Sequence, residues 1–393
     1  MGEVTTGRTD RGSRGRRPRR RVRVATVAGV PVLLSASWLV IAVAVTVLFG
    51  PVAARATGLP VPAAYLVAVV LAVLLAASVL VHEAAHAVAA RRAGLHVEEV
   101  VVDLWGGHTS LGRPATPGTS AVVSVVGPLA NLVLAGVASA ARALVPAAPA
   151  DDVVSVAAVV GFLLAAVALV NLVLGLFNLV PGLPLDGGRV LEALVWRVSG
   201  SQDTGAVVAG WAGRAVAVAL VAWGVGRPLL LGAPPSLFTV VWVVVLAGFL
   251  WQGASASLTV ARFRRRAAEV DLAAVARAAV AVPATASVAD VVAAQGGAEP
   301  REVVLVDPLG RPVAVVPGGS VTDVPLHLRP STPAAAVGLH VAPASVVPAR
   351  LGAVATVEAL ARSGGAGVVL VDDTGRPTAR VLPDDFAAAM GLR

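Results

Sequence analysis

The sequence predicts a polytopic α-helical membrane protein with six transmembrane helices, followed by a cytosolic α/β tail. The 393-residue chain is 57% hydrophobic and only 14% charged, whereas an average soluble protein has about 25% charged residues. Five long stretches contain no Asp, Glu, Lys, Arg or His: residues 24–54, 61–81, 121–141, 153–185 and 228–261. Runs of about 20 apolar residues cross a bilayer as helices. No such run remains beyond residue 266, so the tail is assigned to the water-soluble part.

Residues 1–24 are predicted to form a disordered, basic cytoplasmic arm. Nine Arg and two acids within residues 1–23 account for +7 of the formal net charge of +8. The arm has too few apolar residues to fold alone, and its arginines favour contact with anionic lipid headgroups. No aromatic residue lies among them, which argues against nucleic-acid binding. The apolar run that follows is longer than the roughly 7–15 residues of a signal-peptide core, so it is interpreted as a retained span.

Proline and glycine divide the apolar runs into six predicted spans, near residues 36–54, 63–90, 120–141, 153–180, 205–226 and 236–258. With the arm inside, the inner segments hold 18 Arg and the outer ones hold three, Arg55, Arg142 and Arg227. Positive residues concentrate on the cytoplasmic side, so both termini are expected to be cytoplasmic in a multi-pass plasma-membrane protein. All 31 basic residues are Arg, a bias typical of a bacterial genome rich in GC. Arg214, in the fifth span, is expected to face the bundle interior or a polar cavity.

A metal-binding motif ends the second span, at His82-Glu83-Ala84-Ala85-His86. Positions i and i+4 of a helix lie on one face, so both imidazoles can reach one ion while Glu83 points toward a bound water. Ionisable groups beside an uncharged span are costly unless a site requires them. Because the chain has no Cys, any metal must be bound by His, Asp or Glu.

Asp186 is predicted to be the third ligand. A hydrolytic zinc site typically uses three protein ligands and leaves one position for water. The fourth span ends in residues 178–189, where Pro181, Gly182 and Pro184 prevent a continuous helix. Irregular backbone at membrane depth survives only when it is buried in protein or lines a wet cavity. An even number of crossings separates this segment from the His motif, so both lie on the cytoplasmic side.

Together these motifs resemble the site-2 protease family of intramembrane zinc metalloproteases, in the bacterial subgroup that carries CBS domains. The matching residues are His82, Glu83 and His86, the stretch Asn178 to Gly187, and Gly127-Pro128-Leu129-Ala130-Asn131 at the start of the third span. The resemblance implies a membrane core over residues 25–262 and one zinc ion per chain, bound by His82, His86 and Asp186. It implies that Glu83 is the general base of a zinc metalloendopeptidase. The substrate would be a single-span membrane protein, cut within its transmembrane segment in regulated intramembrane proteolysis.

The resemblance also implies that residues 97–109, including Gly106 and Gly107, form a strand edge that holds the unwound substrate. Valines in this stretch favour a strand, and the Gly pair allows another backbone to approach closely. His108 has no counterpart in the family pattern and is interpreted as a capping or surface residue.

Several polar residues near the spans have two readings each. Asn131 and Asn171 are interpreted as joining helices by hydrogen bonds. Asn178, eight residues before Asp186, is expected to be catalytic by hydrogen bonding to the scissile carbonyl or its oxyanion. Arg189 could neutralise Asp186 or contact lipid phosphate, and the sequence leaves both readings open.

The tail, residues 270–393, contains a duplicated module. Residues 303–307 and 310–312 recur as residues 368–372 and 375–377, with eight identities at a constant offset of 65. Each copy is predicted to be a strand, a turn and a second strand, preceded by a helix near 287–295 or 353–362. This is similar to a tandem pair of CBS domains, and the resemblance implies an adenine nucleotide bound between the halves. A tail that only forms a homodimer is the alternative.

Two other classes of protein fit parts of this pattern. One is a membrane transporter or channel regulated by a CBS tail, and the other is a metal-bound membrane scaffold without turnover. A transporter has no need of the His motif combined with an acid on a facing span. The protease is therefore the preferred hypothesis.

Overall fold

The computed structural model describes residues 21–27, 29–103, 106–111, 116–146, 155–296, 301–363 and 365–392. The chain divides into two compact units, residues 1–258 and 259–393. Residues 1–20 of the predicted arm lie outside the described residues.

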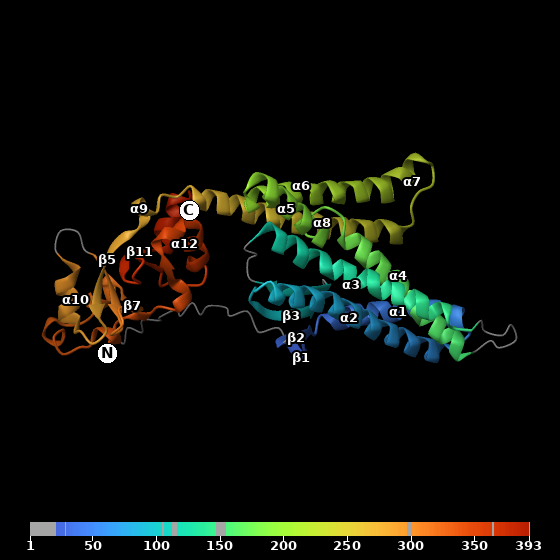
Figure 1. Ribbon diagram of the computed structural model, residues 1–393, viewed down its shortest axis with the longest axis horizontal. Coiled ribbons are helices and arrows are strands. Elements are labelled where there is room, and N and C mark those ends of the chain that lie inside the picture. The colour runs from blue at the N-terminus through green and yellow to red at the C-terminus, as the bar shows by residue number, and fades with distance from the viewer. Residues whose placement is uncertain are drawn as a thin grey trace, which may run out of the picture. The chain divides into compact units, whose positions relative to one another are not determined.

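The first unit is built from long apolar helices (Figure 1). They are α1 (Trp38–Thr57), α2 (Val61–Arg92), α3 (Pro117–Ala143), α4 (Val156–Asn178), the fifth span Gln202–Leu230, and α8 (Leu237–Ala268). The fifth span comprises α6 (Gln202–Val221), a π-helical turn (Ala222–Gly226) and α7 (Arg227–Leu230). The described residues thus include six helices long and apolar enough to cross a membrane, as the sequence predicts.

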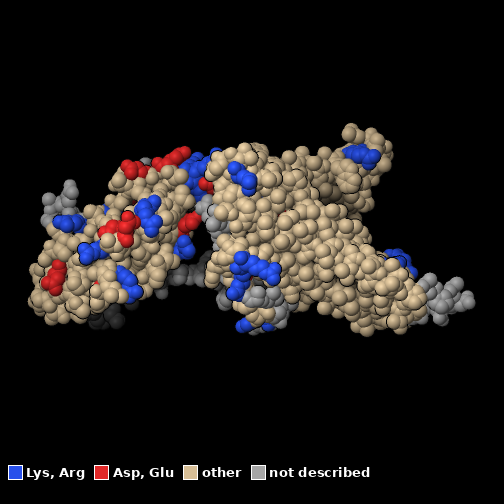
Figure 2. Space-filling view, viewed as in Figure 1, with Lys and Arg blue, Asp and Glu red and all other residues tan. Residues whose placement is uncertain are grey.

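The outward surface of these helices is apolar. Large hydrophobic side chains such as Leu66 (68% exposed), Val133 (64%) and Trp223 (70%) point away from the protein interior. On the face shown in Figure 2, the charged side chains of this unit lie toward its ends, with an uncharged surface between them. Exposed apolar area of this extent is unfavourable in water and favourable in lipid. The first unit is therefore a multi-pass membrane core.

A four-stranded sheet accompanies the helices, in the order β1 (Arg21–Val27), β2 (Val30–Ser35), β3 (Val97–Asp103), β4 (Gly106–Leu111). β2 pairs with β3 in parallel, and the other two pairs are antiparallel. Val30 and Val97 pack on Ala87 and Ala90 near the end of α2. The end of the predicted arm, residues 21–24, lies in β1, where Arg21, Val22 and Arg23 pair with β2.

Arg214 reaches the interface of α6 and α8. Its guanidinium lies 4.9 Å from the ring centre of Trp211 and 4.8 Å from that of Trp251. It also donates a hydrogen bond of 2.9 Å to Ser255 Oγ. Two aromatic faces and one hydroxyl therefore shield this cation, an arrangement that the sequence alone did not indicate.

The second unit is a seven-stranded mixed sheet with helices. Its elements are α9 (Leu272–Val275), β5 (Arg277–Pro283), α10 (Val288–Gln295), β6 (Glu302–Val306), β7 (Pro312–Val316), α11 (Gly318–Thr322), β8 (Leu339–His340), β9 (Val346–Pro348), α12 (Gly352–Leu360), β10 (Val368–Val371), β11 (Pro377–Val381) and α13 (Pro383–Ala389). The strand order is β8-β7-β6-β5-β11-β10-β9. In each copy of the repeat a parallel strand pair is followed by an antiparallel one, β5–β6–β7 and β9–β10–β11. The predicted duplication is thus a repeat of the whole β-α-β-β-α unit.

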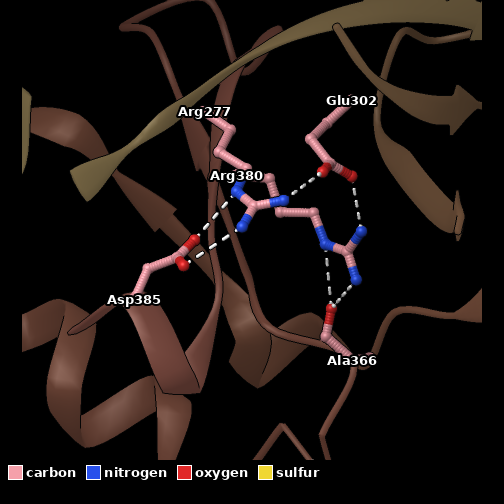
Figure 3. Close-up of polar contacts among 5 residues, drawn as sticks. All are labelled: Arg277, Glu302, Ala366, Arg380 and Asp385. Carbon is pink, nitrogen blue, oxygen red and sulfur yellow. Dashed lines mark hydrogen bonds and ion pairs between the residues drawn. The ribbon is translucent and has the colours of Figure 1, made fainter. Parts of the chain in front are cut away.

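The two copies meet where β5 pairs with β11, and an ion-pair cluster connects them (Figure 3). Arg277 and Arg380 lie opposite each other in this ladder, and like charges in that position repel. Glu302 on β6 reaches both, at 2.6 Å from Arg380 Nη1 and 3.6 Å from Arg277 Nη1. Arg380, which is 5% exposed, also donates to the Ala366 carbonyl. Hydrogen bonding to Asp385 raises the pKa of Arg277 above its ordinary value.

Candidate metal centre

The His motif lies in the last third of α2, within an unbroken helix of 32 residues. His82 and His86 are one helical turn apart and present their rings to the protein interior, each 7% exposed. Glu83 is also buried, at 6% exposure. The apolar residues that precede the motif supply the hydrophobic length of the span. The imidazoles consequently occupy a dry environment inside the membrane core.

Asp186 is placed by a loop that folds back between α4 and α5 (Asp186–Ser199). Leu183 in this loop donates a backbone hydrogen bond of 3.0 Å to the carbonyl of Ala209 on α6. A Cβ at Gly187 would overlap the Leu179 carbonyl, and one at Gly188 would overlap Leu183 N. The two glycines after Asp186 are therefore needed for the loop to pack against the start of its own helix.

The structure brings together His82, His86 and Asp186 from α2 and α5. His82 Nε2 lies 3.2 Å from Asp186 Oδ2, and His86 Nε2 lies 3.3 Å from the same oxygen. The two Nε2 atoms are 3.1 Å apart. Bonds of about 2.0–2.2 Å at tetrahedral angles put zinc ligands about 3.3–3.6 Å apart, close to this triangle. The donor set and its spacing fit one zinc ion.

Gly127 on α3 leaves the space that this cluster requires. A Cβ there would overlap His86 Nε2 and lie 2.8 Å from His82 Cε1. The glycine of the Gly-Pro-Leu-Ala-Asn stretch thus lets a third helix approach the ligand atoms themselves. A side chain at this position would fill the volume in which an ion would lie.

The outer nitrogen of each imidazole has its own hydrogen-bond partner. His86 Nδ1 is 2.6 Å from the Val123 carbonyl, and His82 Nδ1 is 2.5 Å from Asn131 Oδ1. Both partners are acceptors, so each Nδ1 carries the proton and each Nε2 presents a lone pair. In metal sites, a hydrogen bond at the nitrogen that does not bind the ion typically fixes the orientation of the imidazole ring in this way.

Asn178, Gly106, Gly107, His108 and Arg189 are not members of this triangle. Asn178 is the last residue of α4, half-buried, and its side chain forms no hydrogen bond within the described part of the chain. Gly106 and Gly107 begin β4, which is the edge strand of its sheet and pairs with β3. His108 lies in β4 opposite Val101, and its side chain is outside the described residues. Arg189 is exposed on α5 and forms no ion pair with Asp186.

Sequence reasoning did not find Ser78, which hydrogen bonds to Asn171 beside the cluster. Its spacing was a usable signal, because Ser78, His82 and His86 recur every four residues and share one helix face. Ser78, eight positions before His86, therefore lies on the face of α2 that carries the two histidines.

Residues 144–221 match the family model of Peptidase family M50. These residues are similar to that family. The matched stretch contains Asn178 and Asp186, whereas His82 and His86 precede it.

Two curated proteins and one solved structure are similar to a larger part of the chain. A Synechocystis protein provisionally named zinc metalloprotease sll0528 is 32% identical over 241 residues, which are 60% of this chain and 59% of that protein. The provisionally named zinc metalloprotease Rip3 of Mycobacterium tuberculosis is 42% identical over 185 residues, 47% of this chain and 44% of that protein. The solved site-2 protease from Methanocaldococcus jannaschii aligns with a TM-score of 0.42 and 22% identity, over 61% of this chain and 95% of that one. The chain thus spans about half the length of the curated relatives it matches.

Proposed function

We propose that the protein is an intramembrane zinc endopeptidase that hydrolyses a peptide bond in the transmembrane segment of a single-span membrane protein. The observation that carries this proposal is the convergence of His82 Nε2, His86 Nε2 and Asp186 Oδ2 within 3.3 Å of one another inside a membrane core. The M50 match and the names of the relatives support a zinc metalloendopeptidase. The donor set contains no sulfur, as expected for a hydrolytic rather than a thiolate-bound structural zinc site.

His82, His86 and Asp186 would hold the ion, which would supply Lewis acidity to a water and to the scissile carbonyl. Glu83, buried beside His82, accepts a proton from that water as its oxygen bonds to the carbonyl carbon. Glu83 then delivers the proton to the amide nitrogen as the C–N bond breaks, which yields a carboxylate and an amine. Asn178 donates a hydrogen bond to the carbonyl oxygen as negative charge develops on it.

The substrate would bind in extended form along β4. Among the described strands, β4 stands at the end of the sheet order β1-β2-β3-β4 and has a strand partner on one side only. Gly106 and Gly107 at its start allow a second backbone to approach. Strand addition at such an edge satisfies the backbone groups of a segment that leaves its helical form. A single-span protein is the simplest substrate that can present an unwound segment at this depth.

The orientation follows from the distribution of arginine. With 18 Arg assigned to inner segments and three to outer ones, both termini would face the cytoplasm, in the plasma membrane of a bacterium. The lipid bilayer is then the solvent of the six helices, and the exposed Arg262, Arg265 and Arg266 would contact the inner leaflet.

The second unit would be a tandem CBS-like regulatory domain. Its duplicated β-α-β-β-α unit supports this assignment, since two similar halves share one sheet. An adenine nucleotide between the halves, or a homodimer formed through the tail, would be its partner. No nucleic acid is expected as a ligand.

The test uses the full-length protein in lipid nanodiscs, with zinc content and cleavage of single-span substrates both measured. Glu83→Gln should keep zinc and abolish cleavage, whereas His82→Ala, His86→Ala or Asp186→Ala should lose zinc, because a base and a ligand have different roles. Glu192→Gln, an acid on α5 that bonds to Gln202, is the matched control and should change neither. Full zinc in Asp186→Ala would remove the third ligand, and zinc without cleavage of any tested substrate would favour a scaffold.

A further inference from the structure

A chain of buried hydrogen bonds runs from the metal centre through α3 and α4 and returns to α2. His82 Nδ1 contacts Asn131 Oδ1 at 2.5 Å, and Asn131 Nδ2 donates to Asn171 Oδ1 at 2.8 Å. Asn171 Nδ2 in turn donates to Ser78 Oγ at 2.9 Å. Asn131 and Asn171 are both 0% exposed, and Ser78 is 6% exposed. The chain thus joins α2, α3 and α4 through groups that have no access to water.

Backbone carbonyls at its far end fix the direction of every hydrogen bond in this chain. Ser78 Oγ lies 3.0 Å from the Leu74 carbonyl, and Asn171 Nδ2 lies 2.9 Å from the Val167 carbonyl. A carbonyl oxygen can only accept, so the hydroxyl of Ser78 must donate and the NH2 group of Asn171 must face Val167. A reversed Asn171 amide would place two oxygens against each other.

The orientation of Asn171 in turn determines the donor and acceptor of each hydrogen bond between it and His82. Because its NH2 group is so oriented, Asn171 presents its oxygen to Asn131, which must therefore donate through Nδ2. Asn131 then presents Oδ1 to His82, whose Nδ1 must carry the proton. The only lone pair left on that imidazole is at Nε2, which faces Asp186 and His86.

We propose that Asn131, Asn171 and Ser78 are positioning residues that fix the tautomer and ring orientation of His82 and thereby set the affinity of the metal centre. We call these three residues the amide relay. The inference rests on the proposed function, since it presumes that His82 is a metal ligand. It adds that two residues with no hydrogen bond to His82, His86 or Asp186, namely Asn171 and Ser78, determine how well zinc binds.

The full-length protein in nanodiscs would be titrated with zinc against a competing chelator. Asn131→Leu removes the acceptor and should weaken zinc binding by about 10- to 100-fold, the usual effect of losing a partner of a ligating histidine. Asn171→Leu should weaken it by about tenfold, at the lower end of that range. Ser78→Ala, the mildest change, should weaken it by about threefold, as expected for one lost hydrogen bond.

Asn131→Asp distinguishes positioning from helix packing. Both Asn131→Leu and Asn131→Asp break the bond to Asn171, but only the carboxylate still accepts from His82 Nδ1. The positioning role therefore predicts zinc affinity close to wild type for Asn131→Asp. A packing role predicts the opposite order, because a carboxylate buried in a membrane protein costs more than a leucine. The absorption of bound Co²⁺ would report any change in the ligand geometry of the same variants.

Thr57→Val is the matched control, because this buried hydroxyl bonds to the Ala53 carbonyl of its own helix and leads to no histidine. It should leave zinc binding unchanged. Wild-type affinity in Asn171→Leu and Ser78→Ala would overturn the relay, as would equal loss in Asn131→Leu and Asn131→Asp. Unchanged zinc binding in His82→Ala would instead overturn the proposed function, so the two failures are distinguishable.

Discussion

At the scale of single residues, Gly127 is the position where one added carbon should matter most to the metal centre. Its missing Cβ leaves room for both imidazoles, and a methyl group there would overlap His86 Nε2. Both rings are held by their Nδ1 hydrogen bonds and cannot easily retreat. Gly127→Ala should therefore weaken zinc binding by at least about tenfold, comparable to loss of an outer partner of a ligand.

Gly136 provides the control for that prediction, because it lies on the same helix and an added Cβ would meet nothing within 4 Å. Gly136→Ala should leave zinc binding intact and stabilise the helix slightly. Chelator competition on both variants gives the answer. Equal affinities would contradict the steric role of Gly127.

Only part of the candidate site could be predicted from the sequence. The three residues that meet at the candidate metal centre could be picked out in advance, because a His pair at i and i+4 and an acid after a broken helix are each visible in the sequence. The partner of His82 could not, since Asn131 is 49 positions away and three span asparagines were available. Which amide meets which imidazole depends on helix packing, and local pattern does not contain that information.

At the scale of elements, the spans were predictable and the membrane-associated sheet was only partly so. Each span can be recognised in the sequence from the length and hydropathy of its apolar run. β1 begins in the basic arm, β2 lies in the apolar stretch that leads into the first span, and β2 pairs with β3 more than 60 residues away. Long-range pairing of this kind leaves no local periodicity. The tail was easier, since its repeat marks equivalent strands in both copies.

The junction of β5 and β11 gives an element-scale prediction about the tail. Glu302→Gln removes the one charge between Arg277 and Arg380 and leaves the buried Arg380 without its carboxylate. Breaking a buried ion pair from one side typically costs about 3–5 kcal/mol, and partial exposure of Glu302 places the expected loss near the lower value. Hydrogen exchange of the buried β6 amides, Val303 to Leu305, would measure it.

Asp373→Asn is the companion variant for this measurement. It removes the ion pair with Arg350, in which both side chains are largely exposed, at 66% and 83%. Pairs of this kind contribute about 0–1 kcal/mol, so exchange from β6 should hardly change. If both variants increased exchange equally, the cluster at the β5–β11 junction would have no special structural role.

At the scale of the whole molecule, the last helix of the core belongs in part to the tail. The second unit begins at residue 259, before the predicted boundary at 270. Ala267, near the end of α8, is fully buried with Val368 and Phe386, and Arg264 pairs with Glu358 at 3.4 Å. The end of α8, including Arg264 and Ala267, thus takes part in the fold of the tail.

The metal ligands, Gly127 and the amide relay all lie between residues 78 and 186, within the first unit. Deleting residues 270–393 should therefore leave zinc bound. It should change the cleavage rate or its response to nucleotide, because a ligand of the tail affects activity only if it binds the active and inactive states with different affinity. The deletion also removes the partners of Ala267 and Arg264, so a second truncation after residue 258 separates loss of the tail from damage to α8.

Zinc content, cleavage and calorimetry with adenine nucleotides would be measured on all three proteins. Loss of zinc in both truncated chains would contradict the independence of the metal centre, and the absence of nucleotide binding to the intact chain would leave homodimerisation as the role of the tail.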